Sequence, residues 1–271
     1  MRSSAIDRTA VVDPKAKIAD DAFIGPYCVI GPDVTIGSGC RLVAHVHVSG
    51  HTQIGQRTVV YPFASLGTPP QSVKYRGGPT RLVVGADCDI REGVTMNIGT
   101  EDDDGLTEVG DRCFFMANSH VAHDCKVGND VTFANSVAIG GHVTVGDNVV
   151  FGGGAVARQF VRIGEGAMIA GLAGVRGDII PYGLAQLNPA YLVGLNVVGL
   201  RRRGVSKTDI HQLRQTYRTL FFGDGHFKDR VEALATSGGN GPLVDSVLSF
   251  IRSASRPLTT AIHRADLGAL S

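Results

Sequence analysis

The chain of 271 residues has 26 basic and 25 acidic residues, a formal net charge of +1, and no tryptophan. This balance excludes an extended surface for polyanions, so we expect no nucleic-acid partner. No apolar run reaches the roughly 18 residues of a membrane span, and residues 1–10 lack the apolar core of a signal peptide. We therefore expect a cytoplasmic protein.

An apolar residue recurs at every sixth position almost from the start of the chain. From Ile6 to Leu66 the phase is unbroken, and the residue four positions later is mostly small or β-branched. A period of six fits neither an α-helix nor a half-buried strand. It is typical of a parallel β-helix, in which each hexad gives a short strand and a corner, and three hexads complete one coil of a triangular prism.

The repeat is interrupted twice, at residues 67–82 and 99–107. The first interruption contains three prolines and three glycines, and the second is acidic, with Asp102, Asp103 and Asp104. We interpret both as loops that leave the prism, and long irregular loops in compact repeat proteins are usually functional. For the acidic segment we favour a solvated turn over a metal site, because no histidine and no regular ligand spacing accompany the carboxylates.

The longest series has 12 consecutive apolar positions, from Val109 to Val175. We expect residues 1–190 to form a left-handed parallel β-helix, with the hand taken from known hexapeptide prisms. The cysteines all stand at the small position of a hexad, which indicates packing rather than disulfides. They are Cys28, Cys40, Cys88, Cys113 and Cys125.

Residues 191–271 are expected to form a small α-helical domain. After a connector over residues 182–200, Ser206 is placed to cap a helix that begins at about Lys207, with Asp209 at the third helical position. Further helices are expected over residues 227–235 and 243–254. Their apolar stripes need to pack against the prism or against another subunit.

Candidate catalytic residues gather in the long series. His120, His123 and His142 avoid the inward phase, and His123 stands at a corner next to Asp124. A carboxylate beside a histidine raises its basicity and fixes its tautomer, so His123 can act as a general base. A corner histidine with no role beyond polarity is the alternative for each one alone. The three could also ligate zinc, but no fourth ligand is visible, and we expect no metal.

Because the prism interior is filled, any binding site lies outside, and a groove there needs a second wall. Flat faces favour symmetric packing, so we expect a homotrimer.

Five ordered segments together resemble the UDP-N-acetylglucosamine O-acyltransferases of lipid A biosynthesis. The resemblance extends from Ile6 to about Phe222. It implies a trimer that moves an (R)-3-hydroxyacyl chain from acyl carrier protein to the 3-hydroxyl of UDP-N-acetylglucosamine. It further implies a site between neighbouring subunits and neither a cofactor nor a covalent intermediate. The segments are QSVKYRGGPTR (71–81), AHDCKVGN (122–129), GGHVTVG (140–146), RQFVRIG (158–164) and GLNVVGLRRRG (194–204).

The resemblance also implies roles for single residues. His123 takes the proton of the sugar hydroxyl, Asp124 orients His123, and the N–H of Gly141 faces the thioester oxyanion. Gly171 stands where the family measures the acyl chain, and the lack of a bulky side chain there implies a long chain. The residues implied to bind substrate are Gln71 and Lys74 on the first loop, His120, His142 and Gln159 along the cleft, and Asn196, Arg202 and Arg203 at the nucleotide.

Three positions depart from the family pattern. Ser72 stands where Asp is usual, Val198 where Glu is frequent, and Arg158 where His is usual. Because these positions bear on acceptor recognition, transfer to a 3-amino analogue of the sugar is an alternative, although we favour the 3-hydroxyl. The hexads alone would also fit a different hexapeptide acyltransferase, a non-catalytic β-helix scaffold or a γ-carbonic-anhydrase-like metalloenzyme.

Overall fold

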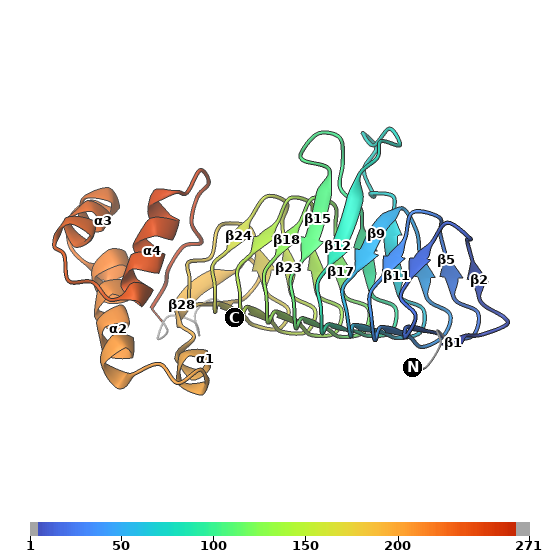
Figure 1. The fold of residues 1–271 in the computed structure, drawn as a ribbon. Coiled ribbons are helices and arrows are strands. Elements are labelled where there is room, and N and C mark those ends of the chain that lie inside the picture. Colours follow the sequence, from blue (N-terminus) through green and yellow to red (C-terminus); the bar gives the residue numbers. More distant parts are fainter. Residues whose placement is uncertain (1–4, 264–271) are drawn as a thin grey trace.

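The computed structural model describes residues 5–263 and has two parts, an elongated prism and a group of helices at its C-terminal end (Figure 1). Strands β1 to β26 are two to four residues long, and their sheets form three faces of the prism. Face 1 is an 11-stranded sheet of β1 (Ala5–Ile6), β4 (Phe23–Ile24), β7 (Arg41–Leu42), β10 (Val59–Val60), β13 (Asp89–Ile90), β16 (Phe114–Phe115), β19 (Thr132–Phe133), β22 (Val150–Phe151), β25 (Met168–Ile169), β27 (Gly183–Gln186) and β28 (Tyr191–Leu195).

The other two faces have nine and eight strands. Face 2 contains β2 (Val11–Val12), β5 (Val29–Ile30), β8 (His47–Val48), β11 (Ser65–Thr68), β14 (Thr95–Asn97), β17 (His120–Val121), β20 (Ala138–Ile139), β23 (Val156–Ala157) and β26 (Gly174–Val175). Face 3 contains β3 (Lys17–Ile18), β6 (Thr35–Ile36), β9 (His51–Ile54), β12 (Arg81–Val84), β15 (Leu106–Val109), β18 (Lys126–Val127), β21 (Thr144–Val145) and β24 (Arg162–Ile163).

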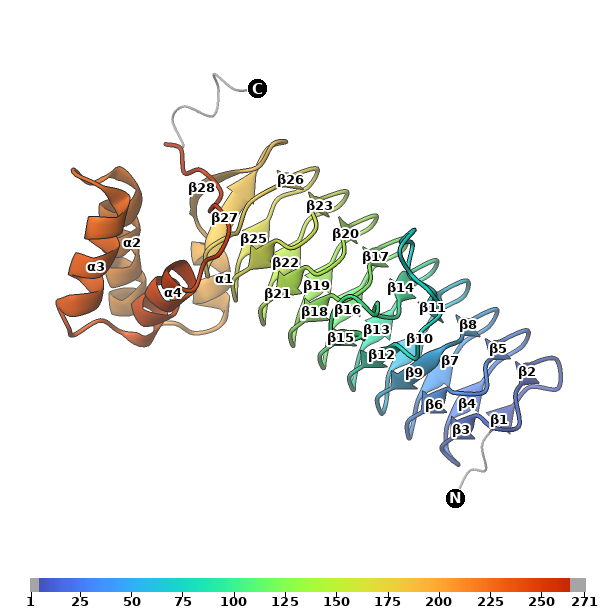
Figure 2. The same cartoon turned by 90° about the horizontal axis from the view of Figure 1, so that it is seen from above.

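The strand register confirms the six-residue repeat. Ala5 pairs with Phe23, one coil of 18 residues later, and the strands stack in parallel coil upon coil (Figure 2). Where the expected loops intervene, the partners move apart in sequence: Val59 pairs with Asp89, and Asp89 with Phe114. Both loops leave the edge between faces 2 and 3, so they project from the same side of the prism (Figure 1).

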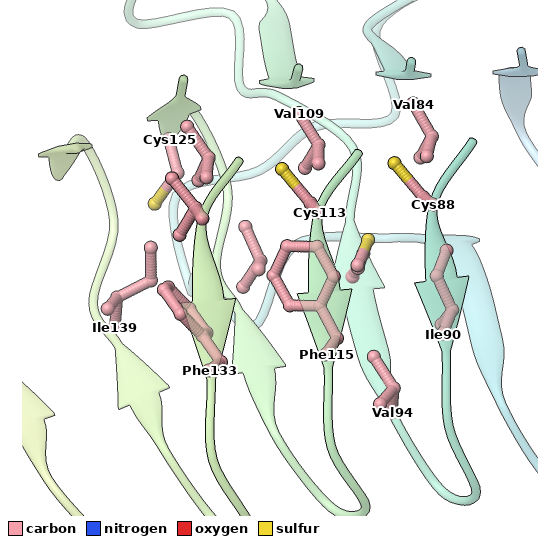
Figure 3. Close-up of a cluster of buried hydrophobic side chains, with 14 of the residues drawn as sticks. Val84, Cys88, Ile90, Val94, Val109, Cys113, Phe115, Cys125, Phe133 and Ile139 are labelled. Carbon is pink, nitrogen blue, oxygen red and sulfur yellow. The ribbon is translucent and has the colours of Figure 1, made fainter. Parts of the chain in front are cut away.

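From β4 onward, the prism interior is filled by the second residue of each two-residue strand and by the small residues beside the corners. Phe115, Phe133 and Phe151 occupy the same inward position in successive coils, and their ring centroids are 5.1 and 4.8 Å apart. Figure 3 shows two of these rings beside Cys88 and Cys113. All five cysteines are buried and free, as expected from their position in the hexads.

Four helices follow the prism: α1 (Val197–Arg202), α2 (Lys207–Phe222), α3 (Phe227–Thr236) and α4 (Pro242–Arg252). The cap of α2 is confirmed, because Ser206 Oγ accepts a hydrogen bond from the Asp209 N–H over 3.0 Å. Helix α1 covers the last residues of the segment that we expected to be a connector, residues 182–200, and the two arginines that follow it. Strand β28, at the expected start of the second domain, pairs antiparallel with β27. Leu192 of β28 also packs in the helical core, so β28 belongs to the prism and to the helical part alike.

Candidate active site

The edge between faces 2 and 3, called the 2–3 edge, carries the catalytic candidates. Asp124, His142 and Phe160 follow one another in successive coils, each in the left-handed backbone conformation, with φ of 57°, 60° and 66°. The imidazole of His142 stacks on the Phe160 ring at 4.4 Å and 4°. His123, Gly141 and Gln159 each stand one position before these residues, so the coil brings six residues into two adjacent columns.

His123 and Asp124 form a hydrogen-bonded dyad. Nδ1 of His123 lies 2.8 Å from Oδ2 of Asp124, and the two side chains are 12% and 0% exposed. The Asp124 carboxylate also accepts the N–H of Thr100 over 2.8 Å and its hydroxyl over 2.6 Å. These bonds compensate for the burial of the carboxylate. Because Nδ1–H donates to Asp124, Nε2 of His123 keeps its lone pair and can accept a proton.

Gly141 lies against the ring of His123. A Cβ at this position would come within 2.5 Å of His123 Cε1 and 2.7 Å of Nε2, so only glycine allows the backbone to approach so closely. Among residues 5–263, no hydrogen-bond acceptor is found for the Gly141 N–H. An unpaired donor therefore belongs to the residue that contacts the base nitrogen.

The other two histidines also join this cluster. His142 lies with Nδ1 2.9 Å from Asp103 Oδ2 and Nε2 3.6 Å from Asp124 Oδ2, and its ring is perpendicular to that of His123. His120 Nδ1 lies 2.7 Å from the Thr95 hydroxyl. Burial, followed by the charge of His123, lowers the pKa of His120.

The acidic segment is more than the solvated turn that we expected. Asp103 reaches His142, and Asp104 Oδ2 lies 2.6 Å from Lys126 Nζ. Glu101 accepts the N–H groups of Arg76 and Gly78 over 3.2 and 2.5 Å and so holds the first loop. The segment joins the first loop to the dyad. On that first loop, Gln71 and Lys74 are exposed, and the described part of the chain offers Lys74 no ion pair.

Potential metal ligands are present but are already engaged. Ligand atoms of His123, Asp124 and His142 lie within 4.8 Å of one another. Oδ2 of Asp124, however, already accepts hydrogen bonds from His123 and from Thr100. A metal ion would have to displace these bonds, so the geometry favours a dyad over a preformed metal site.

The remaining predicted residues lie away from the 2–3 edge, around helix α1 and on another edge of the prism. Asn196 caps α1 and donates from Nδ2 to the Gly166 carbonyl over 2.9 Å. Arg203 lies beside Gly166, with its guanidinium 5.7 Å from the centre of the Tyr182 ring. Gly166 is at the edge between faces 3 and 1, called the 3–1 edge, and the exposed Gly171 is at the edge between faces 1 and 2, called the 1–2 edge. Arg202, like Arg203, is exposed. One chain alone does not bring these residues to the dyad.

Known proteins share this sequence and this fold. The family description "Udp N-acetylglucosamine O-acyltransferase; Domain 2" matches residues 178–259, and bacterial transferase hexapeptide repeats match residues 15–50 and 107–141. The acyl-[acyl-carrier-protein]--UDP-N-acetylglucosamine O-acyltransferase of Azorhizobium caulinodans is 54% identical over 93% of each chain. That of Rhizobium johnstonii is 45% identical over 98% of each. The chain belongs to this acyltransferase family.

A solved structure of the same family supports the assignment. LpxA from Acinetobacter baumannii, 39% identical, superposes with a TM-score of 0.91 over 94% of this chain and 99% of that one. A coil of the opposite hand would not superpose in this way. The expected left-handed β-helix with a small C-terminal helical domain is therefore confirmed.

Sequence reasoning missed four residues of the acidic segment that hold the dyad, His142 or the first loop in place. They are Thr100, Glu101, Asp103 and Thr107, whose hydroxyl accepts the Asp124 N–H over 2.8 Å. A usable signal was present, because counting coils places both interruptions at the edge that carries His123. Phe160, which stacks on His142, was likewise one coil away in the same column.

Proposed function

We propose that this protein transfers an (R)-3-hydroxyacyl chain from acyl carrier protein to the 3-hydroxyl of UDP-N-acetylglucosamine, the first step of lipid A biosynthesis. Relatives that are 45–54% identical carry the name of this enzyme. The observation that supports the chemistry best is the His123–Asp124 dyad beside the unpaired N–H of Gly141. A cytoplasmic location is part of this proposal. No helix within residues 5–263 is long and apolar enough to cross a bilayer.

The dyad carries the reaction in two steps. Nε2 of His123 accepts the proton of the sugar 3-hydroxyl while the hydroxyl oxygen attacks the thioester carbonyl carbon. The carbonyl oxygen becomes an oxyanion, which accepts a hydrogen bond from the Gly141 N–H. When the intermediate collapses, the C–S bond breaks, and the thiolate of the carrier takes the proton from His123. A thioester is already activated, so the reaction needs neither a cofactor nor an acyl-enzyme.

Substrate binding is assigned to residues around the dyad. Gln71 and Lys74 hold the sugar and phosphate from the first loop, while His120, His142 and Gln159 line the cleft. Arg202 and Arg203 bind the diphosphate, since the guanidinium fork matches phosphate oxygens. The side-chain amide of Asn196 already caps α1, so its contribution is to place these arginines. Gly171 leaves room for a long acyl chain.

A homotrimer that packs through face 2 supplies the second wall of the cleft. No outward position on face 2 holds Asp, Glu, Lys or Arg, whereas face 3 presents Lys17, Glu108 and Lys126. A face without charges can be buried between subunits at little desolvation cost. Exposed apolar side chains flank this face, with Phe63 and Leu172 on one edge and Phe160 on the other. The outward residues of face 2 are Val11, Val29, His47, Ser65, Thr95, His120, Ala138, Val156 and Gly174.

Product analysis tests the proposed activity. The protein is incubated with carrier-protein thioesters of several chain lengths and with both UDP-N-acetylglucosamine and its 3-amino analogue, and the products are weighed by mass spectrometry. We expect a base-labile ester of UDP-N-acetylglucosamine with one long 3-hydroxyacyl chain. A base-stable amide as the main product would establish the 3-amino sugar as the acceptor. If neither sugar is acylated, the proposed function is wrong.

Mixed trimers test whether the site is shared between subunits. His123→Ala and Arg203→Ala chains are each weakly active by expectation, and they are unfolded and refolded together in equal amounts. If neighbouring chains supply the two residues, random mixing leaves about a quarter of the sites with both intact and restores about a quarter of wild-type activity. If activity stays at the level of the separate variants, the two residues act from one chain.

A further inference from the structure

Residues before and after Asp103 in the acidic segment are held by hydrogen bonds or ion pairs to the prism. Thr100 donates twice to the Asp124 carboxylate, and Asp104 pairs with Lys126 Nζ over 2.6 Å. Between these anchors, Asp103 Oδ2 lies 2.9 Å from Nδ1 of His142, a residue 39 positions away in sequence. The neighbouring Asp102 has no hydrogen bond or ion pair within residues 5–263. Only one of these two adjacent carboxylates reaches the histidine cluster.

Stacking alone fixes the plane of the His142 imidazole but not the positions of its two ring nitrogens, which need a further contact. Stacking on Phe160 at 4° sets the plane of the ring. A ring flipped by 180° about the Cβ–Cγ bond would lie in the same plane and stack equally well, because stacking does not distinguish the nitrogen positions from the carbon positions that replace them. The hydrogen bond between Nδ1–H and Asp103 does distinguish them. It leaves Nε2 on the side of the dyad, 3.6 Å from Asp124 Oδ2.

We propose that Asp103 is a positioning residue for acyl transfer and that it acts through His142. This inference rests on the function proposed above. Asp103 selects the tautomer and the orientation of His142, so that an unprotonated Nε2 faces the space next to His123. There it can accept a hydrogen bond from the bound acceptor sugar while His123 removes the proton. Asp103 itself touches neither the dyad nor the reacting atoms.

Asp103 is half-exposed, so the expected effect on rate is moderate. Replacing Asp103 by Ala removes the acceptor, and we expect kcat to fall about tenfold, as for one lost hydrogen bond to a charged group. We expect KM for the carrier-protein thioester to stay unchanged, because the proposal gives Asp103 no contact with that substrate. Asp103→Asn keeps an oxygen at the same place and should restore kcat to within about twofold of wild type.

The matched control is Asp102→Ala, which removes the same charge from the same segment. We expect its kcat to equal that of the wild type. A double variant, Asp103→Ala with His142→Ala, should be no slower than His142→Ala alone, because a residue that acts only through His142 has no effect without it. An additional loss in the double variant, or an Asp103→Asn variant as slow as Asp103→Ala, would overturn the proposal.

Nitrogen-15 spectra of the His142 ring give a readout that is independent of turnover. In the wild type we expect the proton on Nδ1, and in Asp103→Ala a mixture of the two tautomers. Wild-type spectra with the proton on Nε2 would contradict the assignment. If the wild type acylates neither sugar, the proposed function fails. If it is active and Asp103→Ala is equally fast, only the role of Asp103 is rejected.

Discussion

The 2–3 edge and the 3–1 edge of the prism share one backbone device. At both, a residue with positive φ recurs at the corners of several successive coils, so the side chains of these coils stack. On the 3–1 edge, Arg57 forms two hydrogen bonds of 2.6 Å with Asp87, and Arg112 pairs in the same way with Asp130. On the 2–3 edge, the corresponding positions hold Asp124, His142 and Phe160.

The two edges differ in whether every polar atom of their stacked side chains has a partner. The guanidinium and carboxylate of Arg57 and Asp87 are 55% and 39% exposed and satisfy each other. The Asp124 carboxylate is fully buried and is shared by Thr100 and His123, which leaves Nε2 of His123 without a partner among the described residues. The same positive-φ corner therefore supports a ladder of mutually paired charges on the 3–1 edge and a histidine with a free ring nitrogen on the 2–3 edge, to which we assign the role of base.

The largest effect is expected at the 2–3 edge itself. Replacing His123 by Ala removes the base, and kcat should fall about a thousandfold, within the range for general-base catalysis. The control is His45→Ala, a histidine with positive φ stacked between Tyr27 and Phe63 on the 1–2 edge. It should transfer acyl chains at the wild-type rate. Steady-state assays and gel filtration compare the variants, and more than a tenth of the activity left in His123→Ala would refute the base.

The second largest effect is expected at Gly141, whose backbone lies against the ring of His123. In Gly141→Ala, the new Cβ would lie 2.5 Å from His123 Cε1, so the ring has to move, and we expect about a hundredfold lower kcat. Gly153 stands at the same position of a 1–2 edge corner, where a Cβ meets nothing nearer than 3.5 Å. Gly153→Ala should therefore change kcat less than twofold. Equal losses in the two variants would mean that corner glycines are needed for folding alone.

A third prediction concerns the pH dependence of stability at His120, which lies on face 2 next to the 2–3 edge. Burial lowers the pKa of His120, so below about pH 6.5 the unfolded chain binds a proton that the folded chain does not. Stability is thus full above that pH and declines as the pH falls through the folded pKa. In His120→Gln, we expect the difference in Tm between pH 7.5 and 5.5 to shrink by about 3 °C. The exposed His211 on α2 provides the control, and His211→Gln should keep the wild-type difference.

The smallest effect is expected on the 3–1 edge. Hydrogen bonds from Arg57 lower the pKa of Asp87, so its contribution is present at pH 7 and disappears only as the pH falls through the folded pKa. Because the pair is exposed, Asp87→Asn should lower Tm by no more than about 2 °C, less still in high salt, with kcat unchanged. Scanning calorimetry checks this. A loss of activity in this variant would end the distinction between the two edges.

The fold could be predicted because the repeat is local. Each hexad carries its own strand, its inward residue and its corner. The burial of residues such as Ile24 and Phe133 can therefore be predicted from their position in the hexad, without knowledge of distant residues. The start of helix α2 could likewise be predicted from its capping residues Ser206 and Asp209. Helix α1 was not, because its six residues are held by contacts of Asn196 with Gly166, a residue 30 positions away.

The dyad could be predicted because His123 and Asp124 are neighbours in sequence. The partners of the dyad could not, because the Asp103–His142 and Thr100–Asp124 contacts depend on how an irregular loop folds back over the edge. No period governs such a loop, and its acidic composition alone indicates solvent. That Arg203 and Gly171 lie away from the dyad was not predicted for a different reason. The edge near which a residue lies becomes clear only when whole coils are counted.

The antiparallel pairing of β28 with β27 has a consequence beyond the fold of one chain. A stack of parallel coils ends in unpaired backbone groups that could template a coil from another molecule. Here β28 covers β27 on face 1, Ile179 pairs with Ile163 of β24, the last strand of face 3, and Leu258 pairs with Asp178. The reversed strand therefore removes, from this face, a backbone edge on which a coil of another molecule could pair.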